Sequence, residues 1–162
     1  MNCTLYLAQK FSLLPNYDVV NQYDQTAFRV AADFSLGRHL LICNPQGQQV
    51  AEIKKVLLAW LNKFEVMQYG QIVGDIEQKF SLFSRKIEVN YLGWQVRGSF
   101  PFWNYEVYDA SGRQIAVIDK ELFHFTDHYA IHYDNPADSL NLLCLALAID
   151  SIVDSSRNAA NS

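Results

Sequence analysis

Hydrophobic and polar residues alternate along most of the chain up to Asp134, in short runs such as 63–67 and 86–91. Turn-forming residues separate these runs, for example at 44–47 and 109–112. Alternation with a period of two is typical of antiparallel strands that bury one face. The pattern therefore predicts about a dozen short strands and a mainly β chain until Asp134.

The chain after Asp134 has a different pattern, which predicts one helix. Residues 134–138, Asp-Asn-Pro-Ala-Asp, offer an N-cap, a proline for the first helical position and an acid for the first turn. Residues 140–149 are almost all apolar, on every side of a helix, so this helix must be enclosed. We expect the helix at about 137–153, within a single domain over 1–154, and a disordered tail over 155–162.

A closed barrel would enclose such a helix. A barrel of about eight strands is filled by its own side chains, whereas one of roughly eleven or twelve strands can hold a helix. The expected helix would be about 24 Å long, close to the height of such strands. We therefore predict an antiparallel closed barrel of about twelve strands around a buried hydrophobic C-terminal helix.

The sequence also repeats itself. Residues Gln9–Leu13 recur as Gln78–Leu82, and Gly47–Lys55 is echoed by Gly112–Lys120. The spacing of the copies is too long for a solenoid repeat and fits two pseudo-repeated halves of one closed sheet.

The net charge, the cysteines and the apolar runs of the sequence limit the functions that we expect. Thirteen Lys and Arg against 17 Asp and Glu give a net charge of −4, which disfavours a nucleic-acid partner. Cys3, Cys43 and Cys144 match neither a metal knuckle nor a disulfide framework, and buried free thiols are expected.

There is no secretory signal, and the most apolar run is shorter than a membrane span of ~20 residues. We expect a cytoplasmic protein without a transmembrane span.

Motifs for enzyme chemistry are absent from the sequence. It contains no nucleophile elbow, zinc-protease, phosphate-loop or dinucleotide motif, so we expect neither a catalytic site nor a cofactor. His124, His128 and His132 recur every four residues, but on a strand such neighbours stand about 13 Å apart, too far for one metal ion. An enzyme whose residues converge only in space stays open as an alternative.

Two segments, 57–61 and 100–103, carry consecutive large apolar residues that cannot all point inward. They are the best candidates for a surface that contacts a ligand or a membrane, with basic residues nearby. The predicted residues of this surface are Lys54, Lys63, Arg85, Lys86, Trp60, Phe102 and Trp103.

Lys55 and Lys120 occupy equivalent positions in the two repeats and share a strand face with Ile53 and Ile118. A lysine on an apolar face needs an acid or a helix C-terminus. Our hypothesis is that at least one of them reaches Asp150 or the last carbonyls of the central helix. The alternative is that each lies past the barrel rim or beside a bulge that turns it outward.

The segments Gln9–Leu13, Gly112–Lys120 with the following Glu121–Tyr129, and Leu145–Asp150 resemble the LURP-one-related family. This family belongs to the tubby C-terminal-like superfamily, to which phospholipid scramblases are also related. The resemblance implies a twelve-stranded barrel around a hydrophobic C-terminal helix and no established enzyme activity.

The resemblance also directs the expected function. Tubby proteins bind phosphoinositide headgroups through basic residues, although their basic motif has no residue-by-residue match here. We expect a non-enzymatic binding or scaffold domain for an anionic phospholipid or another membrane component. The alternatives are a module that binds a protein partner through exposed aromatic turns, and an enzyme with a spatially assembled site.

Overall fold

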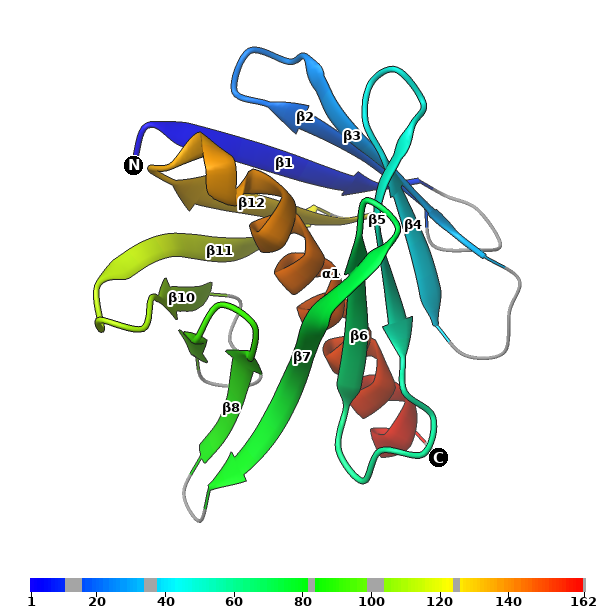
Figure 1. Cartoon of the computed structure of the whole chain (residues 1–162), viewed down its shortest axis with the longest axis vertical. Coiled ribbons are helices and arrows are strands. Elements are labelled where there is room, and N and C mark those ends of the chain that lie inside the picture. The colour runs from blue at the N-terminus through cyan, green and yellow to red at the C-terminus, as the bar shows by residue number, and fades with distance from the viewer. Residues whose placement is uncertain (11–15, 34–37, 82–83, 99–103, 124–125, 162) are drawn as a thin grey trace.

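The computed structural model describes residues 1–10, 16–33, 38–81, 84–98, 104–123 and 126–161. Within them are twelve strands, a short 3-10 helix and one long α-helix (Figure 1). The strands are β1 (Cys3–Gln9), β2 (Asn16–Asn21), β3 (Thr26–Ala32), β4 (His39–Cys43), β5 (Gln49–Lys55), β6 (Lys63–Gln68), β7 (Gln71–Ser81), β8 (Ser84–Val89), β9 (Trp94–Arg97), β10 (Asn104–Tyr108), β11 (Gln114–Phe123) and β12 (Thr126–Tyr133). The helices are η1 (Pro136–Asp138) and α1 (Ser139–Ala160).

The strands form one closed antiparallel barrel. Each strand pairs with the next along the chain, and β1 pairs with β12 to close the sheet. The side chains alternate as the sequence pattern predicts: Tyr17 and Val19 of β2, and Phe64 and Val66 of β6, are buried while their neighbours are not. The predicted twelve-stranded barrel is confirmed.

Three turns at one end of the barrel share a geometry. The side-chain oxygens of Asn21, Asn44 and Asp109 each accept hydrogen bonds from the backbone N–H groups two and four residues later. The fourth residue of each turn has a positive φ, which is 81° at Gly47 and 82° at Gly112 and is easily adopted by glycine. Two of these turns belong to the two sequence repeats, which supports the two-halves architecture.

The helix begins as predicted and ends later than predicted. The Asn135 side chain accepts a hydrogen bond from the Ala137 N–H, and Pro136 occupies the first helical position. All residues over 142–153 are buried inside the barrel, as expected for an enclosed helix. However, α1 continues to Ala160, so residues 155–160 are helical where a disordered tail was expected.

The serines near the C-terminal end of α1 are accommodated within the helix. The Ser155 and Ser156 hydroxyls donate to the backbone carbonyls of Ser151 and Ile152, one turn earlier. These bonds satisfy the polar side chains within the helix instead of in a turn. The polar composition of residues 155–160 therefore does not end the helix.

Among the described residues, one helix, Pro136–Ala160, is long and apolar enough to cross a membrane by length and composition alone. However, 67% of its most apolar window is buried inside the barrel, which is the environment of a core helix.

The up-and-down order of the strands gives the barrel two distinct ends. The turn end holds the connections that follow β2, β4, β6, β8 and β10, together with the start of α1. The loop end holds the connections that follow the odd-numbered strands and the last turns of α1. At the loop end, the connection between β5 and β6, residues 56–62, is described in full and lies near the C-terminal end of α1 (Figure 1).

Candidate functional site

A charged group of α1 lies buried toward the loop end of the barrel. The carboxylate of Asp150 is 2% exposed and accepts hydrogen bonds from the hydroxyls of Tyr17 and Tyr129, the latter at 2.7 Å. The guanidinium of Arg38, just before β4, lies 2.8 Å from the same carboxylate. A cation and two hydroxyl donors thus satisfy a charge that would otherwise be costly to bury.

Arg38 is itself held by two acids. Its second terminal nitrogen lies 2.8 Å from Asp154, one turn further along α1. Burial, and next the charge of Asp150, raise the pKa of Tyr17 well above its ordinary value, so its hydroxyl stays protonated and donates. Arg38 is therefore neutralised in place and fixes α1 to β4.

Lys55 and Lys120 both lie on the inward face of their strands. Lys120 is 6% exposed, and its ammonium nitrogen lies 5.1 Å from the centre of the Tyr129 ring, a cation–π arrangement. The Lys55 ammonium lies 3.3 Å from the Ser155 hydroxyl oxygen. Lys55 thus reaches the helix at a hydroxyl and not at Asp150.

The cation that pairs with Asp150 is Arg38, a residue that the sequence analysis did not select. Arg38 stands two positions before Leu40, which begins the buried face of β4. The period-two pattern could therefore have identified it as an inward-facing charge. Tyr17 and Tyr129 also lie on buried faces, beside Val19 and Ile131.

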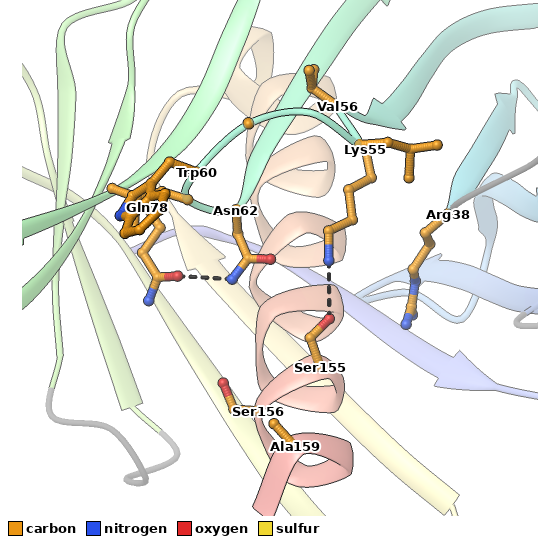
Figure 2. A pocket seen from close by; sticks show the side chains of 12 residues that line it. Arg38, Lys55, Val56, Trp60, Asn62, Gln78, Ser155, Ser156 and Ala159 are labelled. Atoms are coloured by element: carbon orange, nitrogen blue, oxygen red, sulfur yellow. Dashed lines mark hydrogen bonds between the residues drawn. The ribbon is translucent and has the colours of Figure 1, made fainter.

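A pocket of about 680 Å³ lies at the loop end, beside Lys55 (Figure 2). Its size is in the range of small-molecule binding sites. It is bounded by the β5–β6 connection and the last turns of α1. Its polar lining residues are Arg38, Lys55, Asn62, Gln78, Ser155 and Ser156, and its apolar ones are Val56, Leu57, Ala59, Trp60, Leu61 and Ala159.

Most polar groups of the pocket already have partners. The Asn62 amide donates to the Gln78 side-chain oxygen at 2.8 Å, and the Ser155 hydroxyl donates to the Ser151 carbonyl (Figure 2 shows the Asn62–Gln78 bond). Lys55, in contrast, forms no ion pair with any carboxylate in the described part of the chain. The pocket therefore combines apolar walls with one ammonium group that forms no ion pair within the part of the chain that the structure describes.

The β5–β6 connection projects large apolar side chains into solvent. Leu58 is 99% exposed, Trp60 is 96% exposed and Leu57 is 62% exposed. The connection is closed by backbone hydrogen bonds, from Val56 N–H to the Lys63 carbonyl at 2.9 Å and from Ala59 N–H to the Val56 carbonyl. The expectation that the segment 57–61 cannot turn wholly inward agrees with this arrangement.

The basic residues predicted near the exposed segment 57–61 differ in their exposure and in their ion pairing. Lys54 is exposed on the outer face of β5, and Lys86 is exposed on β8. Lys63 is half-buried and lies 3.2 Å from Asp75, so its charge is paired. Arg85 belongs to β8, but its side chain lies outside the described residues, as do Phe102 and Trp103 entirely.

Other sequence predictions concern metals and thiols. In the described ranges, no group of three His, Cys, Asp or Glu could hold a metal ion. His128 and His132 lie on β12, the strand expected for them, whereas His124 lies outside the described residues. Cys144 is buried, which raises the pKa of its thiol to about 12, and the other two cysteines are partly exposed.

Comparison with known proteins adds a family and a fold. Residues 3–150 match the sequence model of the LURP-one-related family. The uncharacterised protein YxjI of Bacillus subtilis (strain 168) is 23% identical over 152 residues, which cover 92% of this chain and 93% of that protein. An Arabidopsis thaliana protein known from an X-ray structure superposes with a TM-score of 0.63 and 13% identity, over 96% of this chain and 91% of that one. Nothing in these similarities points to a catalytic activity.

Proposed function

The chain belongs to the LURP-one-related family, and we propose that it is a binding domain whose loop end attaches to membranes containing anionic phospholipid. No reaction is known for this tubby-like barrel, so the proposal is based on the side chains exposed at the surface of the molecule. The observation that carries it is the β5–β6 connection, in which Leu58 and Trp60 are almost completely exposed.

Exposed side chains of this size favour an apolar environment. Burying a Leu or a comparable side chain fully contributes about 1.5–3 kcal/mol, and Trp is enriched at membrane interfaces, where its ring and its N–H are both satisfied. Because α1 fills the barrel, these side chains cannot gain that energy by folding inward. Partial insertion into the interface of a bilayer would supply it.

The distribution of basic residues also favours contact of the loop end, and not the turn end, with an anionic membrane. Lys54, next to the exposed connection, is free to approach an anionic surface, where each basic residue contributes about 1 kcal/mol. At the turn end, Arg113 is the only Lys or Arg in the five turns, all of which the structure describes, and it pairs with Asp109 at 3.2 Å. The net charge of −4 would repel the rest of the surface from such a membrane.

The sequence of another connection points the same way. β9 ends and β10 begins at the loop end, and the residues between them include Phe102 and Trp103, which lie outside the described residues. Trp is one of the two residue types enriched at membrane interfaces.

Sedimentation with vesicles tests the proposal. The wild-type chain should sediment with vesicles of phosphatidylcholine and phosphatidylserine, and less at moderate salt or without the anionic lipid. The double variant Leu58→Ser/Trp60→Ser should bind about tenfold or more weakly, because it removes two interfacial anchors. The matched control is Tyr23→Ser/Tyr69→Ser, since both tyrosines are 73% exposed but lie at the turn end.

Three outcomes would overturn the proposal. They are a wild-type chain that leaves both kinds of vesicle empty, a Leu58/Trp60 variant that binds like the wild type, and a turn-end variant that loses binding equally. The first of them would favour the alternative in which the exposed connection contacts a protein partner.

A further inference from the structure

The pocket at the loop end contains a cation whose position follows from strand alternation. On β5, Lys54 points outward and is exposed, while Lys55 follows the inward face of Ile53. Figure 2 shows the Lys55 side chain extending toward Ser155 of α1. An ammonium group can donate three hydrogen bonds, and the Ser155 hydroxyl accounts for one of them. The two remaining N–H groups can donate to an anionic ligand.

The charge of that ligand follows from the neighbouring groups. Arg38 also lines the pocket, but its guanidinium is already paired with Asp150 and Asp154. Lys55 is therefore the basic side chain of the pocket lining that forms no ion pair among the described residues. This arrangement suits a head with one negative charge better than a phosphate monoester, which carries nearly two.

The walls favour a hydrocarbon chain beside that head. Leu57, Trp60 and Leu61 form one side of the pocket, and Ala159 of α1 contributes to the other. The apolar residues make up half of the lining of this pocket of about 680 Å³, and most of its polar side chains are already paired with one another or with α1. Leu58, although exposed, is not among the lining residues.

From these observations we infer that the pocket binds a single long-chain carboxylate, with its head on Lys55 and its chain along Leu57, Trp60 and Leu61. This goes beyond attachment to a bilayer, because one dissolved amphiphile would occupy the site without any membrane. Lys55 provides specificity for the anionic head, and the β5–β6 connection provides the apolar contact.

Calorimetric titration with dodecanoate, below the concentration at which it forms micelles, tests this inference. The wild-type chain should bind one dodecanoate saturably, and dodecanol, which has the same chain and no charge, should bind at least tenfold more weakly. Lys55→Gln should weaken dodecanoate binding about tenfold to a hundredfold, because a hydrogen bond to a charged group contributes about 1.5–3 kcal/mol. Lys55→Arg, which keeps the charge, should restore most of it.

Two control variants distinguish dodecanoate binding in the pocket from effects of the neighbouring surface. Lys54→Gln removes the adjacent charge on the outer face of β5 and should leave dodecanoate binding unchanged. Leu58→Ser should weaken vesicle sedimentation and leave dodecanoate binding unchanged, since Leu58 does not line the pocket. Failure of the membrane proposal would thus be distinguishable from failure of this one.

The inference is overturned by any of four results: no saturable dodecanoate binding, equal affinity for dodecanol, equal loss of binding in Lys54→Gln, or unchanged binding in Lys55→Gln. Should Lys55→Gln fail to fold, as judged by circular dichroism, the comparison of dodecanoate with dodecanol on the wild-type chain still decides. Lys55→Arg then tests the position of the charge.

Discussion

The two ends of the barrel hold the central helix by different chemistry. At the turn end, the neutral side chain of Asn141 accepts hydrogen bonds from the Gln68 amide at 2.7 Å and the Tyr91 hydroxyl at 2.9 Å. At the loop end, the carboxylate of Asp150 is paired with Arg38 and two tyrosines. Among the described residues, charge is thus buried only at the end that also carries the pocket and the exposed apolar connection.

The backbone around the helix also differs between the two ends of the barrel. At the turn end, Gly74 leaves room for Tyr91 to reach Asn141, because a Cβ on Gly74 would lie 2.6 Å from the Tyr91 Cβ. Side-chain caps close three of the five turns at this end. The turn end is built mainly for stability, whereas the loop end combines a structural charge network with the exposed apolar side chains of the β5–β6 connection.

The largest stability effect is expected at the charged anchor. Asp150→Ala leaves Arg38 and two buried tyrosine hydroxyls without their acceptor, and breaking a buried pair in this way costs about 3–5 kcal/mol. Urea unfolding followed by circular dichroism measures the loss. Asp154→Ala is the matched control, because it removes the other acid on Arg38 from a partly exposed position and should cost about 0–1 kcal/mol.

Equal losses in the two variants would contradict this account. They would mean that Arg38, and not the buried carboxylate, determines the stability of the loop end. A loss at Asp150 below that at Asp154 would show that the network stabilises the fold very little.

A smaller effect is expected at the neutral anchor. Asn141→Ala leaves the Gln68 amide and the Tyr91 hydroxyl without their acceptor, which costs about 1–3 kcal/mol for partly buried groups. A double-mutant cycle with Gln68→Ala, measured by urea unfolding, isolates the pair. If Asn141→Ala were as destabilising as Asp150→Ala, the contrast between the two ends would not be one of charge.

The alternating pattern was sufficient to predict the barrel and the start of the helix, since both depend on local periodicity and capping. It left two orientations open for Lys55 and Lys120, inward or past the rim, and the structure places both on the inward face of their strands. The end of α1 was missed, since Ser155 and Ser156 satisfy their hydroxyls within the helix. Local composition does not reveal such bonds.

The partners at the candidate site were harder to predict. Arg38 and Tyr17 meet Asp150 across 112 and 133 positions of sequence, and their contact depends on the register of the closed barrel and the depth of α1 within it. Periodicity shows which residues face inward but not which of them meet. The pocket also depends on the path of residues 56–62, which no strand pattern determines.

The smallest predicted effect concerns acid sensitivity at the turn end. The Ser111 hydroxyl first, and then the Arg113 backbone N–H, hold the pKa of Asp109 below its ordinary value. Because the folded pKa is lower than the unfolded one, the charged form stabilises the fold above pH ~4. This contribution is lost as the pH falls through the folded pKa. Asp109→Asn should therefore reduce the dependence of the urea midpoint on pH in that window.

The equivalent turn of the other half provides the reciprocal variant. Asn44 caps that turn with the same two backbone hydrogen bonds that Asp109 accepts, and it carries no charge. Asn44→Asp should introduce a new carboxyl with a lowered pKa, visible by NMR titration, and a new loss of stability in acid. If the Asp109 carboxyl instead titrates at its ordinary pKa, its capping bonds do not favour the charged form. The turn end would then stabilise the barrel through geometry alone, and charge would matter to stability only at the loop end.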